Sequence, residues 1–175
     1  MVIPSLSTQR LSLIPLGLEF LSENYLSWMR DEHIVKFMES GGKNYTLEIL
    51  KEYLKKIERE KIFSWAIVIN ENKSHIGNIK IDPINKKNLY GEYGIMIGDK
   101  SQWGKGYAKE ASEEIIKFCF TTLLLRKINL GVIANNHKAL KLYESMGFIE
   151  EGRFKNHVLF NDKYTDMVRM ALFSY

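Results

Sequence analysis

The stretch Gln102-Trp103-Gly104-Lys105-Gly106-Tyr107-Ala108-Lys109-Glu110-Ala111 lies where an apolar strand pattern gives way to a helical one. The first N–H groups of a helix have no partner inside it, and the helix dipole adds partial positive charge there. Glycines at positions 104 and 106 let the backbone approach a ligand closely. The stretch therefore predicts a strand, a tight turn and a helix start that together hold a phosphate group.

Two common phosphate-binding motifs do not fit this stretch. In a nucleoside-triphosphate loop, four residues separate the first glycine from the Gly-Lys-Ser/Thr end. Here five residues separate Gly98 from Gly104, and Gly106 stands where the magnesium-binding hydroxyl would be. The dinucleotide fingerprint G-x-G-x-x-G needs a third glycine where this chain has Lys109. Both motifs are excluded.

The stretch instead resembles the acyl-CoA pyrophosphate loop of the GNAT N-acetyltransferase superfamily, whose core pattern is Gln/Arg-x-x-Gly-x-Gly/Ala. Aligned on that pattern, the loop covers residues 103–108, so that Trp103 replaces the leading Gln or Arg. This departure is similar to the branch that contains ribosomal-protein N-terminal acetyltransferases and their small-amine relatives.

Further stretches resemble the same branch in family order and cover nearly the whole chain. They correspond to an opening strand, a first helix pair, the strand before the loop, a helix of the pattern Asn-x-x-Ala…Tyr…Gly-Phe, and a closing hairpin. In this sequence they are 8–13, 28–37, 92–98, 136–148 and 151–166. Such a series is far more specific than a single glycine loop.

The order of the expected elements indicates an α/β (α+β) fold in one domain, residues 1–175. The resemblance implies a GNAT-like, mixed, mostly antiparallel central sheet of about seven strands with helices on both faces. The expected strands are 10–16, 63–69, 75–81, 89–97, 128–132, 149–159 and 163–173. The expected helices are 18–29, 31–39, one capped by Thr46, 107–122 and one from Asn136 to Gly147, and residues 82–88 are expected to form a loop.

The composition restricts the class of protein. Apolar residues make up 45% of the 175 residues and charged residues 26%, which favours a folded domain over disorder. The single cysteine, Cys119, excludes an internal disulfide and a cysteine-based metal site, and the four histidines show no ligand spacing, so no metal is expected. There is no signal-peptide pattern and no apolar run near the roughly 20 residues of a membrane span. We therefore expect a soluble cytoplasmic protein without membrane contacts.

The charge pattern does not indicate a nucleic-acid partner. The formal net charge is a modest +4, and the basic stretch 51–61 interleaves lysines and an arginine with glutamates. Such interleaving is typical of a solvated helix face. A homodimer is left open, because the sequence encodes no oligomeric state.

The resemblance implies acetyl-CoA as co-substrate. The strand before the loop would pair its backbone with the pantetheine arm, like an added strand, and the loop amides would take the pyrophosphate. The candidate cofactor-binding residues are Ile95, Met96, Ile97, Gln102, Trp103, Gly104, Lys105, Gly106, Tyr107, Ala108, Asn136 and Lys138. The alternatives are a turn without a ligand for the loop and a helix cap for Asn136.

Two residues are candidates for the catalytic chemistry. An amine with a pKa of about 10 is almost fully protonated at neutral pH, so Glu92 is the candidate general base that helps to remove a proton. Tyr143 is the candidate general acid, which would protonate or hydrogen-bond the leaving thiolate. The alternatives are a strand-edge glutamate that orients the substrate or faces solvent, and a tyrosine packed in the core.

The acceptor is the least determined part of the prediction. Candidate acceptor residues are Trp28, Phe37, Glu39 and Tyr90, each of which fits the core equally well. We expect direct acetyl transfer to a primary amine of a small molecule: a polyamine, an amino sugar (free or nucleotide-linked) or an aminoglycoside. A protein N-terminus is the alternative acceptor, and a non-catalytic sensor of acyl-CoA is the alternative from another class.

Overall fold

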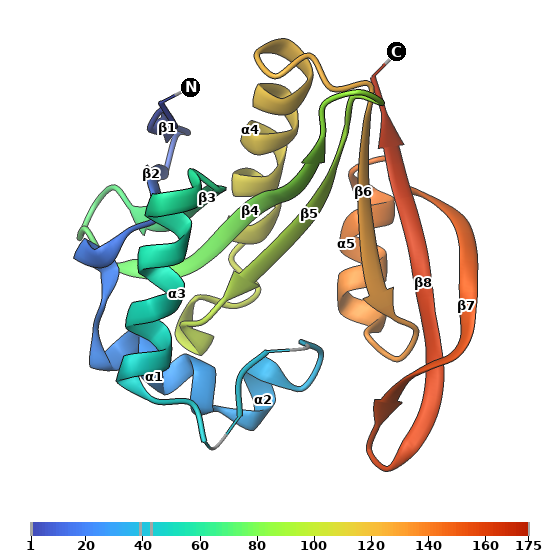
Figure 1. Cartoon of the computed structure of the whole chain (residues 1–175), viewed down its shortest axis with the longest axis horizontal. Helices are drawn as coiled ribbons and strands as arrows, with labels where there is room; N and C mark the ends of the chain where they lie inside the picture. Colours follow the sequence, from blue (N-terminus) through green and yellow to red (C-terminus); the bar gives the residue numbers. More distant parts are fainter. Residues whose placement is uncertain (1, 39, 43, 175) are drawn as a thin grey trace. The chain divides into compact units, whose positions relative to one another are not determined.

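The computed structural model describes residues 2–38, 40–42 and 44–174. Its strands are hydrogen-bonded in the order β1-β2-β3-β4-β5-β6-β8-β7, a mixed and mostly antiparallel sheet (Figure 1). The strands are β1 (Leu6–Ser7), β2 (Leu11–Pro15), β3 (Phe63–Ile69), β4 (His75–Asn85), β5 (Tyr90–Ile97), β6 (Lys127–Ile133), β7 (Ile149–Phe160) and β8 (Lys163–Phe173). The α-helices are α1 (Glu23–Arg30), α2 (Glu32–Val35), α3 (Leu47–Glu60), α4 (Tyr107–Thr121) and α5 (His137–Ser145), with 3-10 turns η1 (Leu18–Phe20) and η2 (Lys100–Gln102). The α/β class and the mixed sheet are confirmed, and the two-residue β1 is the strand that the sequence did not predict.

The chain divides into two compact units, which we describe separately. The first unit comprises Met1–Asp82 and Gly94–Glu114, and the second comprises Pro83–Tyr93 and Ile115–Tyr175. Strands β4 and β5 and helix α4 each contribute residues to both units. The assignment of residues 1–175 to one domain stays a prediction.

The first unit has a core of apolar side chains from α1, α2, α3 and β3. Helix α3 begins where the sequence predicts, because the Thr46 hydroxyl accepts a hydrogen bond from the amide of Ile49 at 3.3 Å. Its residues Leu50, Leu54 and Ile57 recur at helical spacing and are at most 1% exposed. Burying three such side chains contributes roughly 5 kcal/mol to the stability of this unit.

Three boundaries of the first unit differ from the prediction. The helix expected at 18–29 begins only at Glu23, because Ser22 caps it and a 3-10 turn occupies Leu18–Phe20. The helix expected at 31–39 ends at Val35, and residue 39 lies outside the described residues. Strand β4 continues to Asn85, through the stretch expected as a loop, since a proline can stand in a strand where no ladder N–H is needed.

The second unit is built from β6, α5 and the long hairpin β7–β8, with the first residues of β5 pairing in parallel to β6 (Figure 1). The Asn136 side chain caps α5 by accepting from the amide of Ala139 at 3.3 Å, as predicted. Gly147 ends α5 with a φ of 90°, a conformation that glycine adopts without strain. Cys119 is buried, and burial raises the pKa of its thiol to about 12, which fits a packing role.

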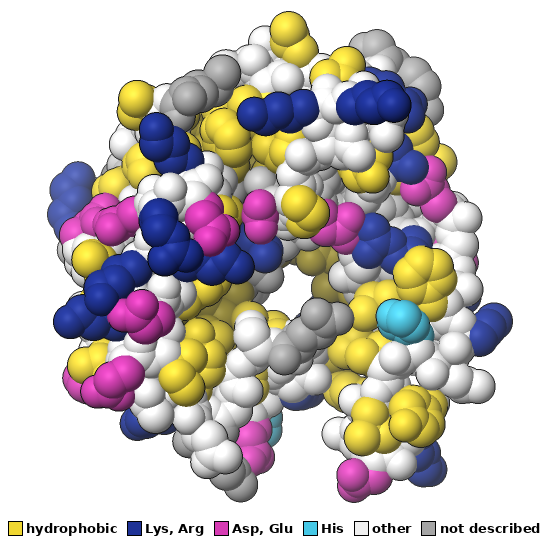
Figure 2. Space-filling model, in the orientation of Figure 1, with side chains coloured by type: hydrophobic (Ala, Val, Ile, Leu, Met, Phe, Trp, Pro, Cys, Tyr) yellow, Lys and Arg dark blue, Asp and Glu magenta, His cyan; other side chains and the backbone are white. Residues whose placement is uncertain are grey.

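The exposed surface of α3 carries charges of both signs. On the face shown in Figure 2, basic and acidic side chains interleave over α3, where Lys55 pairs with Glu52 at 2.8 Å and Arg59 with Glu60 at 3.0 Å. This arrangement is the solvated helix face that the sequence predicts. Among the described residues, no helix is both long and apolar enough to cross a membrane.

Candidate active site

The phosphate loop (residues 103–108) joins the end of β5 and η2 to the start of α4. Gly104 and Gly106 have φ values of 78° and 83°, in the left-handed region that other residues resist. Residues 103–106 are exposed, and a Cβ added at Gly104 would meet no atom within 4 Å. The loop thus presents bare backbone beside the unpaired first N–H groups of α4, which is the geometry of an anion site.

Side chains of the loop bond to neighbouring backbone and side-chain groups. The indole Nε1 of Trp103 donates to the carbonyl of Ile97 at 2.8 Å, which ties the loop to the end of β5. The ammonium of Lys105 donates to the side-chain oxygen of Gln102 at 2.9 Å. The residue that departs from the family pattern, Trp103, therefore links the loop to the strand that precedes it.

The strand β5 extends beyond its ladder with β6. That parallel ladder pairs Tyr90 to Glu92 with 127–129, and within the described residues it ends there, whereas β5 continues to Ile97. On the β4 side the approach is close, because a Cβ at Gly77 would lie 2.2 Å from the carbonyl oxygen of Met96. The carbonyl of Met96 points toward β4. Because the N–H and C=O groups of successive residues in a strand point to alternate sides, those of Ile95 and Ile97 point to the opposite edge of β5.

Glu92 is held by a guanidinium in the second unit. Arg169 of β8 donates from Nη1 to Oε1 of Glu92 at 2.7 Å and from Nη2 to Oε2 at 2.8 Å. The side chains are 30% and 28% exposed, so the pair is only partly screened by water. Gly131 makes room for it, because a Cβ there would lie 2.9 Å from Nη1 of Arg169. The predicted base is thus a carboxylate with a bidentate partner that the sequence did not indicate.

Tyr143 lies in an aromatic cluster of the second unit. Its ring contacts Tyr93 edge-to-face, with centroids 5.9 Å apart, and Phe148 at 5.8 Å. The residue is 8% exposed, and burial raises the pKa of its hydroxyl to about 12. Among the described residues, we find no hydrogen-bond partner for this hydroxyl. The rings therefore fix the position of a protonated hydroxyl that has a bond left to donate.

Glu92 and Tyr143 lie on opposite faces of β5. Successive side chains of a strand point to opposite faces. Tyr93 packs against Tyr143 of α5, so Glu92 points to the face away from α5, where Arg169 meets it. The structure places both predicted catalytic residues in the second unit, but it does not place them in one cluster.

The other predicted residues occupy varied surroundings. In the second unit, Lys138 is exposed, Asn136 caps α5, and the hydroxyl of Tyr90 accepts from Asn85 at 3.4 Å. In the first unit, Trp28 is 4% exposed, and a Cβ at Gly98 would lie 2.1 Å from its ring. Phe37 lies under the ammonium of Lys36, at 4.8 Å from the ring centroid, and Glu39 lies outside the described residues. Their roles in binding stay predictions.

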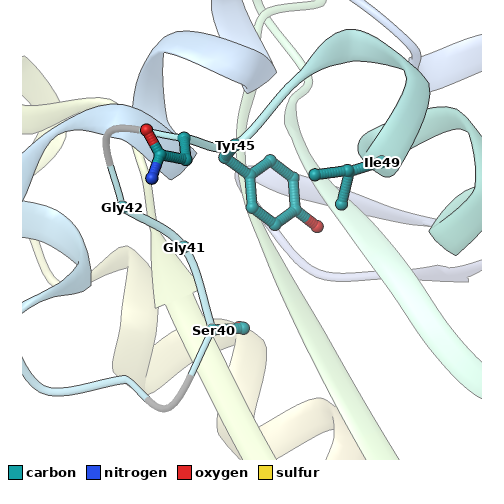
Figure 3. Close-up of a pocket in the computed structure, with 6 residues that line it drawn as sticks. Ser40, Gly41, Gly42, Tyr45 and Ile49 are labelled. Carbon is teal, nitrogen blue, oxygen red and sulfur yellow. The ribbon is translucent and has the colours of Figure 1, made fainter.

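A shallow hollow of about 410 Å³ lies in the first unit between the loop after α2 and the start of α3. It is lined by Ser40, Gly41, Gly42, Asn44, Tyr45 and Ile49. Figure 3 shows the Tyr45 ring lying between this loop and Ile49. Within the described part of the chain, the lining of the hollow contains no acidic or basic side chain, and the phenol of Tyr45 is its one titratable group. Among the described residues, no cluster of His, Cys, Asp and Glu is suited to hold a metal ion.

Arg10 and Glu110, which were not among the predicted site residues, meet beside the phosphate loop. The Arg10 Nε donates to Glu110 Oε2 at 2.7 Å, and Nη1 donates to the carbonyl of Lys105 at 3.0 Å. A local sequence pattern cannot predict a contact between residues one hundred positions apart. The only signal was that Arg10 and Glu110 both stand inside stretches that resemble the family.

Comparison with known proteins gives a consistent result. A family model described as "Acetyltransferase (GNAT) domain" matches residues 10–149. Spermidine N(1)-acetyltransferase of Vibrio cholerae serotype O1 (strain ATCC 39315 / El Tor Inaba N16961) is 36% identical over 106 residues, 61% of this chain and 61% of that protein. The match therefore spans about three fifths of the length of that relative.

Two solved structures resemble the whole fold. The crystal structure of spermidine N-acetyltransferase from Vibrio cholerae in complex with CoA and spermine has a TM-score of 0.84 and 27% identity, covering 95% of this chain and 96% of that chain. Ribosomal-protein-S5-alanine acetyltransferase from Vibrio fischeri has a TM-score of 0.82 and 20% identity, covering 97% of this chain and 96% of that chain. The second likeness, at that identity, concerns the fold alone.

Proposed function

Since the chain belongs to the GNAT acetyltransferase family, we propose that it transfers the acetyl group of acetyl-CoA to a primary amine of a polyamine. The observation that carries the proposal is the phosphate loop, with two left-handed glycines and exposed backbone at the start of α4, inside the matched segment. The polyamine acceptor is supported by the likeness to spermidine acetyltransferase of Vibrio cholerae, whose name appears both for the curated relative and for the solved structure in complex with CoA and spermine.

The residues of the first unit fit the phosphates and the pantetheine arm of CoA. The amides at 104–108 would bind the pyrophosphate, and the outward backbone of Ile95 would pair with the pantetheine amides. The carbonyl of Ile97 already accepts from Trp103, which leaves it one lone pair for a further donor. When bound, acetyl-CoA supplies an acetyl group activated as a thioester.

Glu92 would hold the acceptor and help to remove its proton. Arg169 now uses one lone pair on each carboxylate oxygen, and the remaining lone pairs can accept from an ammonium or from a water that carries the proton away. Arg169 would fix the direction of these lone pairs. The amine then loses one proton on this face of β5.

Tyr143 would act by hydrogen bonding more than by full proton transfer. Its hydroxyl, with a pKa of about 12, is a weaker acid than a thiol with a pKa of about 8.5. Complete transfer of the Tyr143 proton to the departing thiolate would therefore be uphill by roughly 5 kcal/mol. A hydrogen bond to the sulfur stabilises the developing charge without this cost. The ammonium loses two protons in all: the first leaves through Glu92 or its water, and the second, released as the amide bond forms and the C–S bond breaks, supplies the proton that the thiolate gains.

The opposite placement of the two side chains suits a direct transfer. An amine that approaches from the Glu92 face and a thioester sulfur on the Tyr143 face would lie on either side of the reacting carbonyl. Glu92 would then act on the amine alone, and Tyr143 on the thioester sulfur alone. The buried Cys119, whose thiol pKa is raised, is a poor nucleophile and would not form a covalent intermediate.

The test is a thiol-release assay with acetyl-CoA and a panel of amines. The panel contains spermidine, spermine, putrescine, glucosamine, an aminoglycoside and a peptide with an N-terminal alanine. We expect the fastest release with spermidine or spermine, and mass spectrometry should find one added acetyl group. The Tyr143→Phe variant serves as the control for background hydrolysis.

Three outcomes would overturn parts of the proposal. Release only with the peptide would assign the protein N-terminus as acceptor. Saturable CoA binding without release from any amine would favour an acyl-CoA sensor. If CoA at about 100 times the expected Kd fails to raise the melting temperature, which should reflect about 2.7 kcal/mol of added stability, the donor site itself is refuted.

A further inference from the structure

The carboxylate of Glu110, in the first turn of α4, accepts hydrogen bonds from residues that immediately precede β2. Its Oε1 accepts from the hydroxyl of Thr8 at 2.5 Å and from the amide of Arg10 at 2.9 Å. Its Oε2 accepts from Nε of Arg10 at 2.7 Å and lies 2.6 Å from Nη2. Four donors on one carboxylate exceed what a surface ion pair requires.

This carboxylate is held in its charged form. Desolvation would raise the pKa of Glu110, but the bonds from Thr8 and Arg10 outweigh it and leave the pKa below its usual range. The Glu110 side chain is 19% exposed and that of Arg10 is 44% exposed. Water and salt therefore screen the contact only in part.

Arg10 also reaches the phosphate loop directly. Its Nη1 donates to the carbonyl of Lys105 at 3.0 Å, and its guanidinium lies 4.5 Å from the centre of the Tyr107 ring. A Cβ added at Gly106 would lie 3.5 Å from Nη2. One side chain thus touches the middle of the loop, its second glycine and the first residue of the helix.

Such a loop needs an external support. Glycines at 104 and 106 allow the required φ values, but they allow many others as well, so the loop alone would populate several conformations. Binding an anion would then carry the entropic cost of selecting one of them. A planar guanidinium with fixed donor directions can impose one conformation beforehand.

We propose that Arg10 is a positioning residue for the CoA site, and that Thr8, Arg10 and Glu110 form a clamp that holds the phosphate loop in its binding conformation. The inference rests on the proposed function only for CoA as the ligand. Arg10 acts through the loop, because three of its five donors serve Glu110 and the carbonyl of Lys105. Phosphate contacts come from the loop amides.

Substituting Glu110 tests the clamp, because the clamp and simple charge effects predict opposite changes in CoA affinity. Coenzyme A is anionic, so removing a carboxylate beside its site would strengthen binding if charge alone mattered. If the clamp positions the loop, Glu110→Ala weakens CoA binding by about tenfold, because binding must then order a loop that is no longer held in one conformation. Arg10→Ala should weaken it to the same degree, and Arg10→Lys should restore little, since an ammonium cannot bond Glu110 and Lys105 together.

The matched control is Glu113→Ala. Glu113 lies on the same helix, one turn further on, and within the described residues its ion pair is an exposed one with Lys109 at 3.9 Å. The Glu113→Ala substitution removes one negative charge and leaves the clamp intact, so the CoA affinity should stay within about twofold of the wild-type value. Isothermal titration with CoA gives the affinities, and thermal melting of each variant shows that it is folded.

A kinetic comparison distinguishes positioning from general damage. With spermidine as acceptor, the Arg10 and Glu110 variants should raise the KM for acetyl-CoA about tenfold and leave kcat within about twofold. Equal CoA affinity of Glu110→Ala and wild type, or tighter binding, would refute the clamp. A parallel loss of kcat and melting temperature would make Arg10 merely structural. If the wild type itself does not bind CoA, the proposed function fails before the clamp is tested.

Discussion

The phosphate loop and the surroundings of Tyr143 reach a defined geometry by opposite means. The loop is exposed, and polar side chains fix its backbone from both sides: Trp103 through Ile97, and Arg10 through Lys105. Tyr143 is buried, and aromatic rings fix its position by packing. The comparison teaches that directional hydrogen bonds fix the backbone of the loop, whereas the packing of aromatic rings fixes the hydroxyl of Tyr143. Each region should therefore fail in its own way when it is altered.

The largest expected effect belongs to the buried region. Tyr143→Phe keeps the ring that packs on Tyr93 and Phe148 but removes the hydroxyl. We expect kcat to fall about a hundredfold, a usual contribution for a positioned acid or hydrogen-bond donor. CoA affinity and melting temperature should stay close to those of the wild type. Steady-state kinetics with spermidine and thermal melting test this, and unchanged kcat would leave Tyr143 a core residue only.

The pair of Glu92 and Arg169 should behave as a coupled unit. Glu92→Gln leaves a partly buried guanidinium without its charged partner, so we expect about 2 kcal/mol of lost stability. Arg169→Met should cost a similar amount, and the double variant less than the sum of the two. Urea unfolding of the four proteins measures the cycle. If Glu92 is also the base, both proteins that carry Glu92→Gln should have a lower kcat at neutral pH than Arg169→Met alone, and equal activity of all four proteins would contradict that role.

The next effect belongs to the exposed region. Gly106→Ala places a Cβ at a φ of 83°, which costs about 1–2 kcal/mol for an L-residue. We expect CoA affinity to fall roughly tenfold, which is the same free energy, with kcat at saturating donor nearly unchanged. Gly152→Ala is the matched control, since a Cβ there would meet no atom within 4 Å. Identical CoA affinities of the two variants would contradict the role of the loop.

Trp103→Phe is a milder test of the same region. The phenyl ring keeps most of the apolar surface but has no N–H for the carbonyl of Ile97. Loss of one such bond is worth about 1 kcal/mol, or about fivefold in CoA affinity. Isothermal titration is the measurement. A loss far above this value would mean that the indole touches CoA itself.

The smallest effect is a dependence on pH. The pKa of Glu110 is lowered from 4.5, so the clamp's contribution to stability is complete above that pH and is lost as the pH falls through the folded-state value. Wild type should therefore lose more stability between pH 6 and roughly pH 3 than Glu110→Ala does. Thermal melting over this range tests the difference. Equal losses would mean that the bonds from Thr8 and Arg10 do not favour the ionised carboxylate.

The sequence predicts the elements well where a local signal exists. Thr46 and Asn136 are capping residues with helical periodicity after them, and both helices begin as expected. The prediction fails at residues 82–88, which were expected to form a loop, because the strand β4 continues to Asn85. Ser22 is a good cap that the apolar pattern of 18–29 concealed.

In the candidate site, too, the features with a local sequence signal were predicted and the long-range contacts were not. Glycines 104 and 106 reveal the loop, since their backbone conformation is a local property. Arg10 contacts the loop at Lys105, 95 residues away in the chain. Arg169 contacts Glu92 across 77 residues. Such contacts follow from the fold, and no period or motif in a single sequence contains them.

The most direct measurement is an amide-resolved NMR titration of the protein with CoA. The account predicts saturable binding in which the amides of Gly104, Lys105, Gly106 and Tyr107 show the largest shifts. Saturable binding that leaves these four amides unchanged and moves others would contradict the claim that the phosphate loop holds the coenzyme.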